Sequence, residues 1–164
     1  MIPHPWYAIS VKPNAESTVT SMLTAKGYET FLPAYRVRKQ WSDRVKEMKR
    51  PLFPRYTFCR FDFRNRLPIV TTCGVVAVVG FGDEPAPVAE SEIEAVRVLL
   101  DSGLPVSPWP FLREGQRVSV VRGPLTGAEG VFFRNKGDGR LVVTIDLLQR
   151  SIATEIDAGW IKPA

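Results

Sequence analysis

The residue types in this chain that are suited to binding chemistry are concentrated between Arg36 and Arg66. This segment holds eleven Lys or Arg residues against three acids, Asp43, Glu47 and Asp62, so its formal charge is +8, whereas the whole chain carries +5. Such a cluster suits binding of a polyanion, nucleic acid in particular. A solvated surface hairpin would carry the same charge, so charge alone leaves both interpretations open.

Aromatic side chains give the stretch Arg50–Asp62 a second feature. Tyr56 and Phe58 alternate as in a strand, Phe61 follows three residues later, and Pro54 shortly before them restricts the entry into that strand. The basic and aromatic residues of the chain therefore coincide here, and an aromatic surplus on a strand favours contact with a partner.

Groups able to catalyse a reaction are sparse. His4 is the only histidine, and the sequence contains no Cys-x-x-Cys, P-loop or GxSxG arrangement. Cys59 and Cys73 lie in apolar surroundings and are expected to be buried, reduced thiols. Three glutamates at the start of a helix predicted at 90–101 complement the helix dipole. We expect no enzymatic activity, no cofactor and no metal site.

The elements that would position the basic segment begin with a strand at Trp6–Val11. Pro13 and Asn14 supply a strand stop and a helix N-cap, and Gly27 a C-terminal cap. The buried face of the intervening helix repeats at i, i+4, i+7 and i+8, through Ala15, Val19, Met22 and Leu23. Residues 28–37 are extended and lead into a polar hairpin over 38–46, for which 50–62 is the predicted return strand.

The amino-terminal half continues with a short helix near Pro68, an interior strand at 75–81 and the helix at 90–101. This order predicts an α+β sandwich of three or four antiparallel strands with helices packed on one side. We assign it to residues 1–103.

Prolines and glycine then mark a change of domain. Residues 104–112 contain prolines without helical or alternating pattern, which predicts a semi-rigid linker. Beyond it, strands are predicted at 116–121, 131–133, 141–145 and 151–156, with a hairpin turn at 136–139. Residues 113–164 are therefore expected to form a small all-β barrel.

The stretch from Arg113 to Val131 resembles the KOW motif of transcription elongation factors and several ribosomal proteins, which has an SH3-like barrel fold. Its glycines provide bends and its valines fill the barrel. The matching positions are Gly115, Val118, Val120, Gly123, Pro124, Gly127 and Gly130.

The amino-terminal half resembles the leading domain of the NusG family, through Trp6-Tyr7, Leu52 to Tyr56, Gly74 to Val76 and Pro85 to Val88. The Leu52-to-Asp62 pattern and the loop from Asp146 to Ile152 resemble specialised antitermination paralogues of the UpxY and RfaH type. The resemblance covers almost the whole chain. It implies a bacterial, cytoplasmic transcription elongation or antitermination factor that acts as a monomer, without a membrane.

The resemblance also implies two contact surfaces. An aromatic patch would bind the clamp helices of the largest RNA polymerase subunit and suppress pausing, although any of these rings would suit a core position equally well. The patch comprises Trp6, Tyr7, Leu52, Phe53, Pro54 and Tyr56. A basic hairpin would meet phosphates of upstream or non-template DNA, with its tryptophan either stacking on a base or packing the hairpin. Its residues are Arg36, Arg38, Lys39, Trp41, Arg44, Lys46, Lys49 and Arg50.

Some positions depart from the family. Ala128 occupies the place of the aromatic residue through which the general factor meets a ribosomal protein or Rho, so both partners are in doubt here. Thr71-Thr72 is a poor substitute for the His-Thr-Thr-Thr string of RfaH.

Glycines and Pro124 disfavour the helical refolding of RfaH, so we predict a constitutive barrel, with at most one helical turn at 146–150. A free-standing RNA-binding module is the alternative function.

Overall fold

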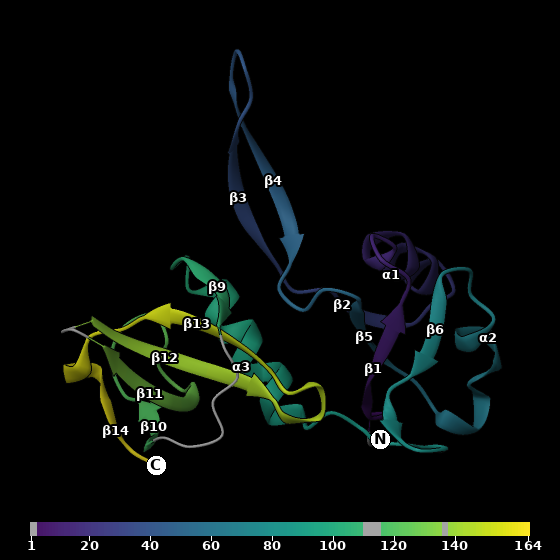
Figure 1. The fold of residues 1–164 in the computed structure, drawn as a ribbon. Coiled ribbons are helices and arrows are strands. Elements are labelled where there is room, and N and C mark those ends of the chain that lie inside the picture. The colour runs from purple at the N-terminus through teal and green to yellow at the C-terminus, as the bar shows by residue number, and fades with distance from the viewer. Residues whose placement is uncertain (1–2, 110–115, 136–137) are drawn as a thin grey trace. The chain divides into compact units, whose positions relative to one another are not determined.

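The protein is described by a computed structural model covering residues 3–109, 116–135 and 138–164. The chain divides into two compact units, Met1–Ala89 and Glu90–Ala164 (Figure 1). No helix within the described residues is long and apolar enough to cross a membrane.

A four-stranded antiparallel sheet organises the first unit. Its order is β2 (Glu29–Phe31), β5 (Tyr56–Arg60), β1 (Trp6–Val11) and β6 (Val75–Val78). β1 pairs with both β5 and β6 and is therefore central, as its almost fully buried pattern requires. The antiparallel α+β architecture predicted for this half is present.

Helix α1 (Glu16–Ala25) covers one face of this sheet. Val19 and Leu23 are buried against Tyr7, Ile9, Val11 and Cys59, whose alternate positions on β1 and β5 point to the same side. The predicted N-cap was wrong by one residue: Asn14 adopts a left-handed conformation with φ 64°, and Ala15 precedes the helix without a capping side chain. Gly27 follows the helix with φ 95°, as the sequence predicted.

The polar hairpin is a separate two-stranded sheet. β3 (Ala34–Gln40) and β4 (Val45–Pro51) pair antiparallel over their whole length and extend away from the sheet of the first unit (Figure 1). The stretch 50–62 is therefore not one return strand. It contains the end of β4, a loop at 52–55, and β5, because β5 pairs with β1 and β2 instead of the hairpin.

The rest of the first unit follows β5 in the chain. A 3₁₀ turn (η1, Phe63–Asn65) leads into α2 (Leu67–Val70), which has a proline in its first turn as predicted. The predicted interior strand at 75–81 is instead β6, an edge strand, followed by β7 (Gly80–Phe81), which pairs with β8 (Glu84–Pro85). Among the described residues only β1 pairs with this strand, and Val76 on it is 61% exposed.

The second unit contains α3 (Glu90–Asp101) and a six-stranded antiparallel sheet. The helix buries Ile93, Ala95, Val96 and Leu99 and packs against β12, and directly after that strand the backbone N–H of Asp146 donates to Glu92 Oε2 at 3.0 Å. The sheet order is β14 (Ile161–Pro163), β10 (Gln116–Val120), β11 (Glu129–Asn135), β12 (Asp138–Ile145), β13 (Arg150–Glu155) and β9 (Val106–Trp109).

Part of the predicted linker belongs to this sheet. β9 lies inside the range 104–112 and pairs with β13, and the Thr154 hydroxyl donates to the Pro105 carbonyl at 2.8 Å. The linker assignment was wrong for 106–109 because proline is tolerated on an edge strand, where its missing N–H faces away from the ladder. Residues 110–112 lie outside the described residues. Closure of this sheet into a barrel, and the domain limits 1–103 and 113–164, remain predictions.

Two short elements complete the second unit. A 3₁₀ turn (η2, Asp146–Leu148) forms the single helical turn that the sequence allowed at 146–150, and Gln149 follows it with φ 51°. Another 3₁₀ turn (η3, Ala158–Trp160) leads into β14, a strand that sequence patterning missed. The first half of the predicted 136–139 turn lies outside the described residues, and Asp138 and Gly139 already belong to β12.

Candidate nucleic-acid interface and aromatic loop

The hairpin β3–β4 places like charges directly opposite one another. Arg36 is paired with Lys49, and Lys39 with Lys46. Like charges facing each other across a strand pair repel, which destabilises the hairpin. The hairpin therefore holds a concentration of positive charge, and an anionic partner would reduce the repulsion between these side chains.

Only one ion pair is seen within the described hairpin. Arg38 Nε lies 3.5 Å from Glu47 Oε1, with the two side chains 79% and 51% exposed. An ion pair this exposed contributes little to stability. All residues from 38 to 50 are exposed, so the predicted nucleic-acid residues Arg38 to Arg50 are available to a partner, as is Arg36.

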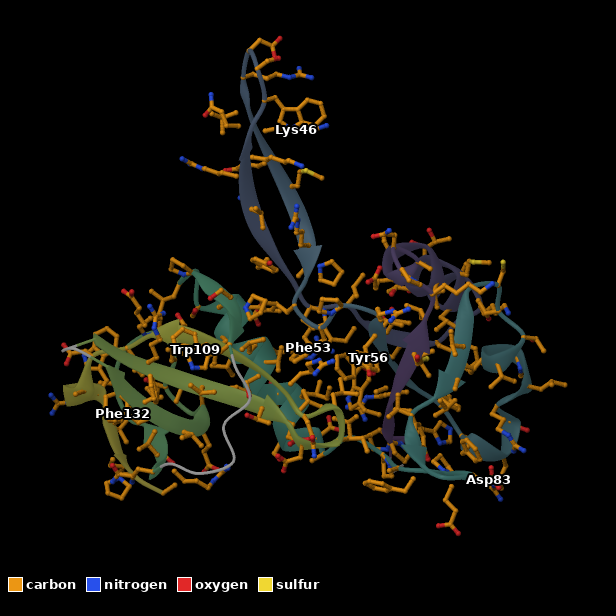
Figure 2. All side chains as sticks on the ribbon, viewed as in Figure 1. Lys46, Phe53, Tyr56, Asp83, Trp109 and Phe132 are labelled. Atoms are coloured by element: carbon orange, nitrogen blue, oxygen red, sulfur yellow. The ribbon has the colours of Figure 1, made fainter. Side chains whose placement is uncertain are left out.

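Trp41 stands at the turn of the hairpin. Its backbone N–H donates to the Arg44 carbonyl at 2.7 Å, and its side chain is 44% exposed. Lys46 Nζ lies 5.2 Å from the centroid of the indole ring, and Figure 2 shows Lys46 near the same end of the hairpin. The predicted basic surface thus includes an exposed ring with a cation beside it.

The predicted aromatic patch does not form one exposed surface. Trp6 and Phe53 are each 1% exposed, Leu52 2% and Tyr7 7%, so these four side chains lie in the interior of the structure. Pro54 is exposed and Tyr56 is half-buried. The expectation that Leu52 and Phe53 face a partner was wrong for this structure, because a buried side chain offers no area for contact.

Aromatic packing explains the burial of these rings. Phe53 packs edge-on against Phe58 with centroids 5.8 Å apart, and Trp6 packs edge-on against Phe31 at 6.4 Å. The Arg60 guanidinium lies 4.7 Å from the Trp6 ring centroid. Phe58 and Phe61, at 0% and 2% exposed, are also buried in the core and not available to a partner. Phe53, which follows the hairpin in the chain, and Trp6 are therefore part of the hydrophobic core.

The loop at 52–55, which leads into Tyr56 at the start of β5, is fixed by its backbone. Arg55 has φ 73°, a left-handed conformation that is uncommon for a residue with a side chain. Glu16, which is 7% exposed, accepts a hydrogen bond from the Arg55 N–H at 2.9 Å, and the Arg55 carbonyl accepts one from Val11 N–H at 2.9 Å. The hydrogen bond of Glu16 to this loop was not predicted from the sequence, because the favourable interaction of an acid in the first helical turn with the helix dipole already explains its position.

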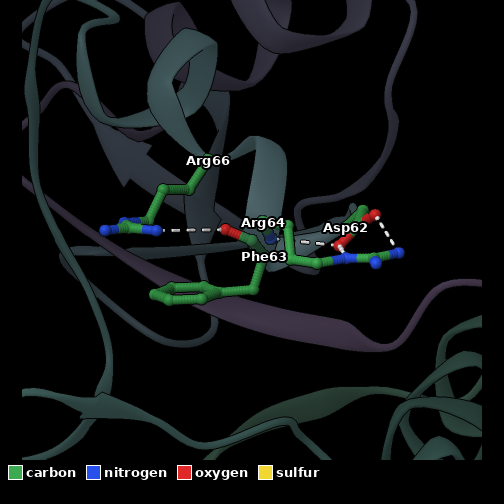
Figure 3. Close-up of polar contacts among 4 residues, drawn as sticks. All are labelled: Asp62, Phe63, Arg64 and Arg66. Atoms are coloured by element: carbon green, nitrogen blue, oxygen red, sulfur yellow. Dashed lines mark hydrogen bonds and ion pairs between the residues drawn. The ribbon is translucent and has the colours of Figure 1, made fainter.

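A charged cluster follows β5 at Asp62 (Figure 3). Asp62 Oδ1 accepts from Arg64 N–H at 3.0 Å and from Arg64 Nε at 3.2 Å, and Arg64 Nη2 lies 3.1 Å from Asp62 Oδ2. These bonds lower the pKa of the Asp62 carboxyl. Arg66 extends over the Phe63 ring with its guanidinium carbon 4.6 Å from the centroid. This cluster caps η1 and offers no arrangement for catalysis.

The thiols differ from one another. Cys59 is buried, as expected, and burial raises the pKa of its thiol to about 12. Cys73 is exposed, which contradicts the expectation that both are buried. Among the described residues, no group of three or more His, Cys, Asp or Glu side chains is arranged to hold a metal ion.

The positions that carry the KOW resemblance lie on β10, β11 and the turns between them. Val118 and Val120 are buried, and Gly123 packs so closely under Trp160 that a Cβ there would lie 2.8 Å from the ring. Gly130 was expected to flank a bend but belongs to β11, where a Cβ would lie 2.5 Å from the Val142 carbonyl oxygen. Gly127 has φ 96°, Pro124 is exposed, and Gly115 lies outside the described residues.

Ala128, which occupies the place of the contact aromatic of the general factor, is 2% exposed. Its carbonyl accepts from Val120 N–H at 2.9 Å, and its own N–H donates to the Leu125 carbonyl at 3.0 Å. These two bonds hold together the turn between β10 and β11. Since its methyl group points into the interior, this position offers no side-chain area to a partner.

Comparison with known proteins identifies relatives of this arrangement. A family model described as "Transcription termination factor nusG" matches residues 4–97. No curated protein matches the chain. Among solved structures, the NusG of Thermotoga maritima, from a study of its domain interaction, is similar with a TM-score of 0.55 and 18% identity over 97% of this chain and 96% of that one. This likeness shows a shared fold.

Two conformations of the MjSpt4:Spt5 complex also match. Conformations B and A are 13% and 14% identical to this chain, each over 97% of it and over 96% and 97% of theirs, with a TM-score of 0.34 in both cases. A TM-score of 0.34 is too low to support a statement about the fold.

Proposed function

This chain belongs to the NusG family of transcription factors, and on that premise we propose that it binds RNA polymerase during elongation and suppresses pausing or termination. The hairpin β3–β4 contacts upstream or non-template DNA, and the loop at 52–55 together with Tyr56 contacts the clamp helices of the largest polymerase subunit. The carboxy-terminal unit recruits a further partner through a KOW barrel. The protein makes and breaks no covalent bond in this role.

The charge on the hairpin is the observation that supports this proposal most. Arg36, Lys39, Lys46 and Lys49 face like charges across the two strands, and all four side chains are exposed. This arrangement lowers the stability of the hairpin by itself, so a core or scaffold role does not account for it. Phosphate groups would relieve the repulsion and release counterions on binding.

The contact with the clamp helices is proposed for a smaller surface than the sequence suggested. Pro54 and Tyr56 are accessible, whereas Phe53 supports the loop from below through Phe58. A half-buried tyrosine on a backbone held by Glu16 and Val11 is pre-organised, which lowers the entropy lost on binding. Tyr56 is therefore the expected anchor.

The experiment is a reconstituted elongation complex with purified core RNA polymerase. The variant R36Q/K39Q/K49Q should weaken binding to the complex and reduce the salt dependence of binding by about 1 in slope for each lysine or arginine lost from a phosphate contact. The control variant K12Q/R122Q/K162Q removes the same charge from exposed positions outside the hairpin and should bind normally. Equal effects of the two variants would show that the hairpin has no specific role.

The alternative function is a free-standing RNA-binding module. It predicts that the chain binds RNA in the absence of polymerase and that core polymerase does not retain it on a column. Retention that is lost on Tyr56→Ala would favour the elongation factor. Retention unaffected by Tyr56→Ala would leave the polymerase contact but place it elsewhere.

A further inference from the structure

Two aromatic rings and an arginine meet on one face of the six-stranded sheet of the second unit. The Trp109 ring on β9 lies 6.0 Å from the Phe133 ring on β11, measured between centroids, and the ring planes are inclined by 60°. The Arg140 guanidinium carbon on β12 lies 4.6 Å from the Trp109 centroid, and Arg140 Nη2 lies 3.5 Å from Glu155 Oε1. We call these residues the Trp109 surface.

The strand register explains why these side chains share a face. Phe133 lies opposite Arg140 on the next strand, and Arg140 lies opposite Glu155. Residues directly opposite one another point to the same side of a sheet. Trp109 lies opposite Ser151, which alternates onto the same side of β13 as Glu155. The sheet therefore brings together residues from four strands.

Packing within the fold uses only part of the two rings. Trp109, Phe133 and Arg140 are half-buried. β9 is already held by its pairing with β13 and by the hydrogen bond from the Thr154 hydroxyl to the Pro105 carbonyl at 2.8 Å. The accessible part of the rings is therefore apolar area that remains for a further contact.

The charges beside the rings indicate the kind of partner. Arg140 and Glu155 carry opposite charges that sum to zero, and the Glu155 side chain is 73% exposed. An exposed carboxylate repels phosphate groups, so the surface favours a neutral ligand over nucleic acid. A guanidinium group has several N–H donors, and a single carboxylate cannot accept from all of them. Arg140 can therefore also donate to a neutral carbonyl oxygen.

We propose that the Trp109 surface binds an extended, proline-containing segment of a partner protein, with a proline ring against Trp109 and Phe133 and a backbone carbonyl accepting from Arg140. Polyproline II segments have no internal hydrogen bonds, so their carbonyls are available, and their stiffness reduces the entropy lost on docking against aromatic rings. The sheet already holds β9, an extended segment containing Pro108, partly through a carbonyl acceptor. The inference rests on the proposed recruitment of a partner by the carboxy-terminal unit and specifies the surface and the class of partner.

The test is fluorescence anisotropy of a labelled decaproline peptide with the full-length chain, with a glycine-serine peptide of equal length as the negative probe. The wild type should bind decaproline with an affinity that hardly depends on salt, because the surface has no net charge. Phe133→Leu, which removes the ring but keeps an apolar side chain, should weaken binding by about 2- to 13-fold. Trp109→Ala should weaken it by about 30-fold or more.

Phe132→Leu is the matched control, because this ring is the neighbour of Phe133 on β11 and alternates onto the opposite face. It should bind decaproline like the wild type. Equal weakening by the two phenylalanine variants, or no binding of decaproline by the wild type, would overturn the inference. Binding of a labelled 15-nucleotide RNA that is lost in Phe133→Leu, in place of decaproline binding, would overturn it in favour of nucleic acid.

Retention on immobilised core polymerase tests the proposed function separately. Phe133→Leu should be retained like the wild type, because the proposed polymerase contact is at Tyr56. Failure of decaproline binding with normal retention would therefore contradict only the Trp109 surface. Failure of the wild type to be retained would contradict the proposed function itself.

Discussion

Glu16, at the start of α1, holds the backbone of Arg55 through a hydrogen bond of 2.9 Å between its Oε2 and the Arg55 N–H. The two residues are 39 positions apart in the chain. The bond links the helix that covers the sheet to the loop in front of Tyr56. A buried carboxylate thus fixes a left-handed residue beside the proposed contact surface.

Replacement of Glu16 by alanine should therefore loosen this loop. The Arg55 N–H would lose its partner, and the free energy of unfolding should fall by about 1–3 kcal/mol. Glu16→Gln is the matched control, because its amide oxygen can still accept the bond, and it should cost less than half as much. Urea unfolding followed by circular dichroism measures both; equal losses would mean that the bond to Arg55 contributes nothing.

Phe53 and Tyr56 should respond to truncation in opposite ways. Phe53→Ala leaves a cavity next to Phe58 and should lower the free energy of unfolding by about 3–5 kcal/mol. Tyr56→Ala should lower it by about 1 kcal/mol and act mainly on polymerase binding. Unfolding curves and retention on immobilised core polymerase separate the two effects. A stable Phe53→Ala variant that fails to bind would restore Phe53 to the contact surface.

Gly130 should tolerate no side chain. In Gly130→Ala the new methyl group would lie 2.5 Å from the Val142 carbonyl oxygen, so β11 and β12 must move apart. We expect a loss of about 1–3 kcal/mol in the free energy of unfolding. Gly139→Ala is a useful comparison, because the two nearest atoms there, at 2.8 Å, belong to the Phe132 ring, which can move, and the nearest backbone atom, the Ile156 carbonyl oxygen, lies farther away at 3.0 Å. A wild-type melting temperature for Gly130→Ala would contradict the observed register of this strand pair.

The two cysteines should differ in reactivity toward a thiol reagent. Only the thiolate reacts, and burial keeps the Cys59 thiol protonated up to about pH 12, whereas Cys73 is exposed. At pH 8 the wild type should label quickly at one site, and Cys73→Ser should label only on unfolding. Fast labelling of Cys73→Ser in the folded protein would show that Cys59 is accessible.

Local pattern predicted those elements that carry a clear signal in their own residues. The strand at Trp6–Val11, the hairpin, the short helix at Pro68 and four strands of the carboxy-terminal sheet follow from alternation, turn residues and proline placement. The basic surface was also predictable, because a charged hairpin without apolar alternation has no core to enter. Missed elements, β9 and β14, are short and owe their structure to a neighbouring strand.

The amino-acid sequence by itself determined that a strongly basic hairpin and an aromatic strand lie next to each other along the chain. Only the tertiary structure decided which rings are available. Phe53 is buried on Phe58 while Tyr56, three residues on, remains accessible, and Ala128 points inward. The physical reason is that alternation assigns a residue to one face of a strand, whereas long-range packing decides which face is covered.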